Sequence, residues 1–364
     1  MQRRLKRYIC CLLAVLCLYS TFPCQSLAIS TSATSAILMD ADSGRILYEQ
    51  NADAKMLIAS TTKILTALIA IESCGLSETV TVSRNAAGTE GSAMYLTAGE
   101  QLTLETLLYG LMLCSGNDAA VAVADHVGGS QEGFAQLMNE TAQELGMTNT
   151  SFANPNGLDH EKHYSTARDM AVLACAAMKN ETLVRIVSTR TITIGGRTMT
   201  NHNKLLSYMD GCIGLKTGYT KAAGRTLVSC AEKNGQRLIA VTLQDGNDWA
   251  DHQALYEYGF AAYPAKRLAV LGQPLKEVTV QGGLQSTVPL VAASSFFWPV
   301  AEGETVKTQV ELDAPLVAPV AAGTTVGQAV FTLNGAEIGR VELLCGENVA
   351  PKVESALRTL KLAG

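Results

Sequence analysis

The segment that decides the fold is Ala59–Ile71, which reads ASTTKILTALIAI. Its apolar residues cover most of the circumference of a helix, which predicts a helix buried on several sides. Ser60 and Lys63 are three residues apart, so on a helix their side chains lie on one face within reach of each other. The segment therefore predicts a buried helix that places a serine hydroxyl beside a lysine amine.

This pair of side chains is suited to nucleophilic catalysis. A serine hydroxyl becomes a good nucleophile when a neighbouring base takes its proton. Lys63 can act as that base only if its pKa is lowered, and burial or a nearby cation such as Lys216 lowers the pKa of a lysine. The structural alternative is that Ser60 is an N-cap and Lys63 is solvated. An SxxK pattern occurs about once by chance in a chain of this length. The pair alone therefore does not decide between a catalytic site and this structural alternative.

Two further short motifs follow in the chain. Ser115-Gly116-Asn117 stands at the break between two apolar helical segments, where polar side chains can point into a cleft. Its structural alternative is an ordinary helix–helix turn with Asn117 as the N-cap. Lys216-Thr217-Gly218 precedes Tyr219 on a segment with strand character, where the lysine and threonine could hold a carboxylate and the glycine admits a substrate backbone. Its alternative is a polar edge strand.

Strand patterns lie near both ends of the first 265 residues, and helical patterns lie between them. This order predicts an α+β domain whose terminal segments share one antiparallel sheet. The expected strands are a hairpin of 36–39 and 45–48, then 191–194, 226–232 and 238–244. After the helix at 59–71, the expected helices are 104–113, 119–127, 133–145, 170–178 and a final one at 251–258 that covers a sheet face.

The character of the chain changes after Pro264, where short β-rich pieces follow one another. They are 278–280, 287–292, 308–312 and 330–332, and Asn334-Gly335 is typical of a hairpin turn. We therefore predict an α+β domain at 29–265, a small all-β domain at 266–346 without a recognisable catalytic cluster, and a short amphipathic helix at 347–364.

The N-terminus has the pattern of a secretory signal peptide. Four basic and no acidic residues precede an apolar stretch from Tyr8 to Tyr19, and Ser26-Leu27-Ala28 offers small residues for cleavage. A retained anchor is the alternative, although the stretch is shorter than the roughly 20 residues that span a bilayer. We predict that residues 1–28 are removed and that the mature chain acts outside the cytoplasm, in the cell wall or at the outer face of the cytoplasmic membrane.

The charge and the cysteine content indicate which partners and which covalent cross-links to expect. Removing the signal takes away 4 of the 28 basic residues and none of the 33 acidic ones, which leaves a net charge of −9. This balance argues against a nucleic-acid partner. Six of the ten cysteines remain, and a chain of this length needs no disulfide to support its core, so we expect mostly free thiols.

SxxK, S-D-N and KTG in this order are the signature of penicillin-binding proteins and class A β-lactamases. With Gly116 in place of the central aspartate, the chain resembles the low-molecular-mass penicillin-binding D-alanyl-D-alanine carboxypeptidases, peptidase family S11. The likeness implies a β-lactamase/D,D-peptidase-like fold, an antiparallel sheet with helices, followed by the all-β domain. It extends over Ile37–Asp40, Glu49–Ala52, Ser115–Ala119, Phe152–Leu158, Tyr164–Met170 and Ala222–Gly224.

The resemblance also implies catalytic roles. Ser60 would form the acyl-enzyme, Lys63 would be the general base, and Ser115 would relay a proton to the leaving D-alanine. The substrate would be a peptidoglycan stem pentapeptide, and β-lactams would be covalent inhibitors. The family implies no cofactor and no metal, and an endopeptidase action on cross-links stays open.

Substrate binding would use the other motif residues. Asn117 would position the substrate amide, while Lys216 and Thr217 would bind the terminal carboxylate beside Gly218. The backbone N–H of Tyr219 would form the oxyanion hole with that of the nucleophile, aimed at charge that develops in the tetrahedral intermediate.

The chain departs from the family pattern at three places. Ile58 stands where many relatives have proline, and the stretch 243–248 lacks the arginine that assists carboxylate binding, a role that Arg225 could take over. The C-terminal amphipathic segment is short, which predicts at most a weak, peripheral membrane contact.

Three other classes compete with the carboxypeptidase. A class A β-lactamase needs a deacylating glutamate in an E-x-x-L-N segment, which does not occur between Asn117 and Lys216. The sequence His160-Glu161-Lys162-His163 could indicate a metallopeptidase. The spacing of its two histidines is not that of HExxH, however, and His163 is as well explained as a loop residue. A penicillin-binding sensor or scaffold would carry a transmembrane segment and an intracellular domain, and neither pattern is found in this sequence.

Overall fold

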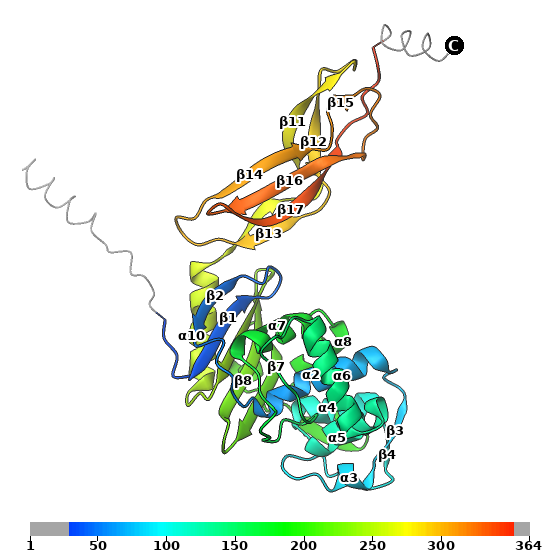
Figure 1. Ribbon diagram of the computed structural model, residues 1–364, viewed down its shortest axis with the longest axis vertical. Helices are drawn as coiled ribbons and strands as arrows, with labels where there is room; N and C mark the ends of the chain where they lie inside the picture. Colours follow the sequence, from blue (N-terminus) through cyan, green and yellow to red (C-terminus); the bar gives the residue numbers. More distant parts are fainter. Residues whose placement is uncertain (1–28, 353–364) are drawn as a thin grey trace, which may run out of the picture. The chain divides into compact units, whose positions relative to one another are not determined.

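Figure 1 shows the computed structural model, which describes residues 29–352. The predicted signal peptide, residues 1–28, and residues 353–364 lie outside the described part. The predicted boundary between residues 265 and 266 stays a prediction.

The first domain is built around a five-stranded antiparallel sheet with the strand order β2-β1-β9-β8-β7. The bounds are β1 (Ser35–Asp40), β2 (Ile46–Gln50), β7 (Cys212–Thr220), β8 (Gly224–Lys233) and β9 (Gln236–Leu243). Strand β1 joins β9 with Ile37 opposite Val241 and Leu38 opposite Ala240. The prediction that the two ends of this domain share one antiparallel sheet is confirmed.

Both faces of this sheet are covered by helices, so every residue of β1 is buried. Ile37 faces the main helical core, whereas Leu38 points the other way, toward α10 (Asp248–Ala262). A Cβ atom at Gly259 of α10 would lie 2.6 Å from Leu38 Cδ2 and 2.7 Å from Leu238 Cδ1. The glycine therefore lets the helix lie directly on the sheet, as predicted for a final covering helix.

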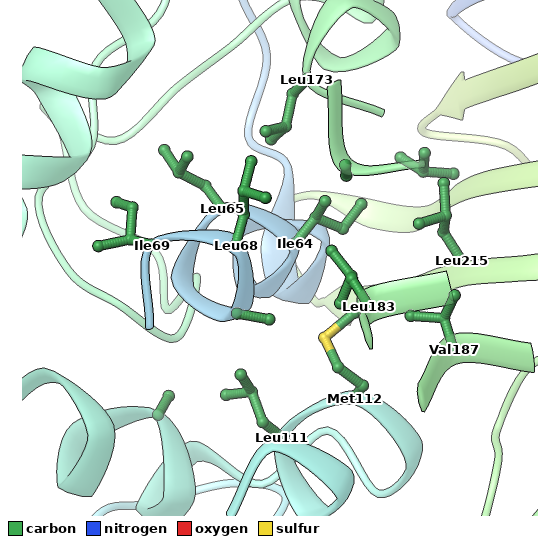
Figure 2. Packing of buried hydrophobic residues seen from close by; sticks show 14 of the residues in the cluster. Ile64, Leu65, Leu68, Ile69, Leu111, Met112, Leu173, Leu183, Val187 and Leu215 are labelled. Atoms are coloured by element: carbon green, nitrogen blue, oxygen red, sulfur yellow. The ribbon is translucent and has the colours of Figure 1, made fainter. Parts of the chain in front are cut away.

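The helical core surrounds α2 (Lys63–Ser73), which follows a short 3-10 helix, η1 (Ala59–Thr62). Figure 2 shows Ile64, Leu65, Leu68 and Ile69 of α2 pointing outward among side chains of neighbouring elements. Every residue from 63 to 70 is buried, so α2 is enclosed as predicted. The neighbouring helices are α4 (Leu104–Leu113), α5 (Asn117–Gly128), α6 (Gln131–Glu144), α7 (Ala167–Ala177) and α8 (Glu181–Ser188).

Some elements were not predicted or differ from the prediction. The strand at 191–194 forms as β5, but it pairs with β6 (Arg197–Thr200) in a separate two-stranded ribbon. Short elements without a long periodic pattern were missed, as was α8. The short ones are α3 (Arg84–Ala87), α9 (Leu205–Tyr208), β3 (Thr79–Thr81) and β4 (Gln101–Thr103).

The remainder of the described chain, up to residue 352, forms the predicted β-structure, with a core of its own around Leu290, Phe331 and Leu343. Asn334 and Gly335 make the predicted hairpin turn between β16 and β17. The strands are β10 (Ala265–Ala269), β11 (Pro274–Gln281), β12 (Thr287–Ala292), β13 (Phe296–Pro299), β14 (Val306–Leu312), β15 (Leu316–Val317), β16 (Thr325–Leu333) and β17 (Ala336–Cys345).

The prediction of a helix from residue 347 is wrong for residues 347–352, which are not helical. Val349 pairs with Val320 and Pro351 pairs with Gly283 as isolated β-bridges. Val349 is 2% exposed, and burying it against the β-core favours the extended path, while proline disfavours a helix interior. Within residues 29–352, no helix combines the length and apolar character needed to cross a membrane.

Candidate active site

Ser60 lies in the 3-10 helix that leads into α2, not in the first turn of α2 itself. The preceding residue, Ala59, has a left-handed φ of +48°, which turns the chain sharply before the serine. The carbonyl of Ile58 accepts hydrogen bonds from Thr61 Oγ1 at 2.6 Å and Thr226 Oγ1 at 3.1 Å. These bonds hold the approach to Ser60 in place.

The amine of Lys63 is enclosed and has three hydrogen-bond partners. Its Nζ lies 2.9 Å from Ser60 Oγ, 2.7 Å from Asn117 Oδ1 and 2.5 Å from the carbonyl oxygen of Asn156. The two latter oxygens can only accept, and the Nδ2 of Asn117 donates to the Glu90 carbonyl at 2.7 Å, which fixes the orientation of that amide. A neutral lysine amine would thus give both its hydrogens to these oxygens and keep its lone pair for the hydroxyl of Ser60.

The electrostatic surroundings favour that neutral form. Burial lowers the pKa of Lys63 well below its usual value, the Lys216 cation lowers this pKa further, and the Asp118 carboxylate acts in the opposite direction. Burial also lowers the pKa of Lys216, to about 7. Burial and the neighbouring Lys216 thus both act on the pKa of Lys63 in the predicted direction.

The second motif lies where α4 ends and α5 begins, as predicted. Ser115 is 5% exposed and takes a left-handed φ of +60°, which breaks the helical path between the two helices. The next buried acid, Asp118, accepts backbone hydrogen bonds from Met94 at 2.9 Å and Leu96 at 3.0 Å. Its carboxylate therefore ties loop 88–99 to the start of α5, next to Asn117.

The third motif lies on β7, at the edge of the sheet. A Cβ atom at Gly218 would lie only 2.9 Å from the backbone nitrogen of Ser60 and 2.4 Å from Thr226 Oγ1. Glycine is therefore required for this strand to lie against η1. Lys216 is 1% exposed and donates from Nζ to the Thr217 carbonyl at 2.8 Å, while Tyr219 is 65% exposed.

These elements surround an open cleft of about 390 Å³. The side of the cleft beyond the motifs carries an ion pair of Arg225 with Asp248, and the guanidinium lies 5.5 Å from the centre of the Trp249 ring. Arg225 is thus placed at the cleft, with its charge balanced by an acid. The lining residues are Ser60, Ser92, Ser115, His202, Thr217, Gly218, Tyr219, Arg225, Asp248 and Trp249.

A buried histidine supports the turn before Ser60. The backbone N–H of Ala153 donates to His163 Nδ1 at 3.1 Å, and His163 Nε2 lies 2.8 Å from Thr62 Oγ1, which in turn donates to the Ala59 carbonyl at 2.8 Å. This order of donors requires the proton on Nε2. Burial lowers the pKa of His163 to about 4, in keeping with a neutral ring. Both ring nitrogens of His163 therefore form hydrogen bonds within the protein, which fits the interpretation of His163 as a loop residue.

Replacing His163 tests whether it positions Ser60, the predicted nucleophile. The amide of Gln can reach the place of Nε2 and donate to Thr62, whereas that of Asn reaches only the place of Nδ1. We expect His163→Asn to lower the rate of Ser60 acylation by about 10- to 100-fold with little change in KM, since small misplacements of a nucleophile carry penalties of this size. His163→Gln should recover most of the rate. Equal losses in two variants of equal thermal stability would contradict the positioning role.

The predicted site residues from the three motifs therefore meet in one place. Ser60, Ser115 and Thr217 face the cleft, and Lys63 bridges the first two motifs through its bonds to Ser60 and Asn117. A serine beside an enclosed lysine, at the edge of an antiparallel sheet packed with helices, is the arrangement expected of a serine peptidase of the D,D-peptidase fold.

Comparison with known proteins identifies the family. Residues 23–247 match the D-alanyl-D-alanine carboxypeptidase family, peptidase S11, and residues 263–351 match the C-terminal domain of penicillin-binding protein 5. The chain belongs to this family of low-molecular-mass penicillin-binding proteins and is a serine peptidase.

Relatives and solved structures agree with that assignment over most of the chain. D-alanyl-D-alanine carboxypeptidase DacF of Bacillus subtilis is 34% identical over 338 residues, which cover 88% of this chain and 85% of the relative. DacC of Escherichia coli is 36% identical, with the same coverage of both chains. The structure of penicillin-binding protein 5 from Haemophilus influenzae has a TM-score of 0.72 and 31% identity, covering 88% of this chain and 98% of that one.

Proposed function

We propose that this chain removes the terminal D-alanine from peptidoglycan stem pentapeptides through an acyl-enzyme on Ser60. The observation that carries the proposal is the environment of Lys63, whose amine meets the Ser60 hydroxyl and two acceptor oxygens in a buried site beside a second lysine. A neutral Lys63 can take the hydroxyl proton as Ser60 Oγ attacks the penultimate carbonyl carbon.

The remaining steps follow from the residues around the cleft. The backbone N–H groups of Ser60 and Tyr219 stabilise the oxyanion, and Lys216 with Thr217 binds the substrate carboxylate. Collapse of the tetrahedral intermediate breaks the peptide C–N bond, and Ser115 passes the proton from Lys63 to the departing amine of D-alanine. Water then hydrolyses the ester at Ser60 and releases the shortened peptide.

Inhibition by β-lactams follows from the same attack. Opening of the lactam ring breaks its C–N bond, but the leaving nitrogen stays attached to the acyl group and does not diffuse away. We therefore propose that β-lactams form a long-lived ester at Ser60. A class A β-lactamase would instead hydrolyse nitrocefin in rapid, repeated turnovers, and a sensor would acylate without any peptide hydrolysis.

The test uses a peptide that ends in D-Ala-D-Ala, beside the same peptide with an amidated C-terminus. We expect release of D-alanine from the free acid and at least about a tenfold lower rate for the amide, because the charge-assisted bonds to Lys216 are lost. Equal rates on both peptides would argue for an endopeptidase. Ester formation without any release would favour the sensor.

The pKa values of the two lysines predict a bell-shaped pH profile for kcat/KM. Activity should rise as Lys63 loses its proton, and it should fall near pH 7 as Lys216 loses the charge that binds the substrate carboxylate. A bound carboxylate stabilises the Lys216 cation, so the falling limb of kcat should lie at higher pH than that of kcat/KM. An active Lys216→Arg variant should lack the falling limb of kcat/KM, because arginine stays charged. A falling limb that is unchanged in this variant would refute its assignment to Lys216.

We further propose that residues 1–28 are a cleaved signal peptide and that the mature enzyme acts outside the cytoplasmic membrane. N-terminal sequencing of the protein exported by its native host should begin at Ile29. The predicted weak membrane contact would have to come from residues 353–364, outside the described part of the chain. Retention of Met1 would identify the apolar stretch as an anchor.

A further inference from the structure

Three side chains with metal-ligating atoms meet on the surface, at the ends of the two helices that begin in the active site. The donor atoms of Cys74, Glu78 and His126 all lie within 4.8 Å of one another, and Glu78 Oε2 lies 3.3 Å from His126 Nε2. Within residues 29–352 this is the one group of three or more cysteine, histidine or acidic side chains with such spacing.

The three residues are held in place by the ends of two helices and by local hydrogen bonds. Cys74 caps the C-terminus of α2, where its N–H donates to the Ala70 carbonyl at 3.1 Å. The Gly75 N–H donates to Glu78 Oε1 at 2.6 Å, which leaves Oε2 directed at the histidine. His126 belongs to the last turn of α5. A cation would therefore find its ligands already gathered from three segments.

The chemistry of the donors selects the kind of cation. Magnesium and calcium prefer an all-oxygen environment, whereas a thiolate, an imidazole and one carboxylate suit zinc. Cys74 is half-buried and Glu78 is exposed, so solvent can supply a fourth ligand. We propose that Cys74, Glu78 and His126 bind a zinc-like divalent cation together with a water molecule, the thiol releasing its proton as the metal–sulfur bond forms.

Such a site would join the far ends of the two helices that build the active site. Helix α2 begins at Lys63 and α5 begins at Asn117, and these two residues share a hydrogen bond of 2.7 Å. At their other ends, Cys74 and His126 would share the cation. The pair of helices would thus be fixed at both ends, so metal binding stabilises the fold without touching the cleft.

Cobalt is the direct probe, because a cobalt–thiolate bond produces a near-ultraviolet charge-transfer band that oxygen and nitrogen ligands do not. The full mature chain should show this band on titration with Co²⁺ alone, and zinc should abolish it by displacement. Cys74→Ser should lose the band and bind zinc at least about tenfold more weakly, as even outer-shell changes weaken zinc sites by 10- to 100-fold. Cys212→Ser, which removes another half-buried thiol, should retain it.

Thermal unfolding gives a second measurement. Saturating zinc should raise the midpoint of the wild-type protein and of Cys212→Ser by about 4 °C, and that of Cys74→Ser or His126→Asn by much less. The absence of a thiolate band in the wild type would overturn the proposal. A band that survives in Cys74→Ser, or equal zinc stabilisation of all four proteins, would place the cation elsewhere and overturn it as well.

Discussion

Ser60→Ala is expected to abolish release of D-alanine and to prevent acylation by labelled penicillin. The change removes the atom that forms the ester in the proposed mechanism, whereas Lys63 and the cleft keep their places. Loss of a peptidase nucleophile lowers kcat by about a millionfold in the best-studied serine enzyme, so no activity above background should remain. Mass spectrometry of a penicillin-treated digest should place the label on the peptide containing Ser60 in the wild type and on no peptide in the mutant.

Two controls make this result specific. Ser207→Ala removes an exposed hydroxyl from α9 and should leave both activities intact. The denaturation midpoint of Ser60→Ala should equal or exceed that of the wild type, which would show that the loss is chemical. If Ser60→Ala still formed a penicillin ester, another hydroxyl would be the nucleophile and the proposed mechanism would be wrong.

Periodic patterns and short motifs in the sequence were enough to predict most of the architecture. The buried α2, the terminal strands of the sheet and the turn at Asn334-Gly335 each follow from a local pattern, and the structure contains all three. The 3-10 geometry at Ser60 was not predicted, because it depends on the left-handed Ala59 and on bonds from the distant Thr226. Long-range contacts of this kind leave no periodic signal in the local sequence.

The supporting residues of the site were missed for the same reason. Asn156 bonds to Lys63 directly, whereas Asp118 and His163 support the neighbouring chain through Met94 and Thr62. Nothing in their spacing distinguishes these three residues from ordinary loop or helix residues. The Asn-Pro-Asn-Gly sequence before Leu158 predicts a turn. It does not reveal that the turn offers the Asn156 carbonyl to Lys63. The motifs predict which groups react, while the tertiary structure shows which residues surround them.

Lys63→Met is the second change with a large expected effect, because it removes the proposed base and keeps a chain of similar length in the buried site. Ser60 Oγ would keep its proton, and general-base catalysis contributes about 10²- to 10⁴-fold, so both acylation by penicillin and peptide hydrolysis should fall by that factor. Lys204→Met, on the exposed surface beside α9, is the matched control and should leave both rates unchanged. Stopped-flow acylation measures the effect directly.

The same variant separates catalysis from stability. Lys63 is enclosed at 0% exposure, and burial disfavours its charged form, so replacing it with an apolar side chain relieves that desolvation. The methionine also leaves the oxygens of Asn117 and Asn156 without their hydrogen-bond donor, and this loss lowers the stability of the fold. We therefore expect a small net change in unfolding midpoint beside a large loss of acylation rate. Acylation that stayed within tenfold of the wild type would mean that Ser60 receives its base from elsewhere.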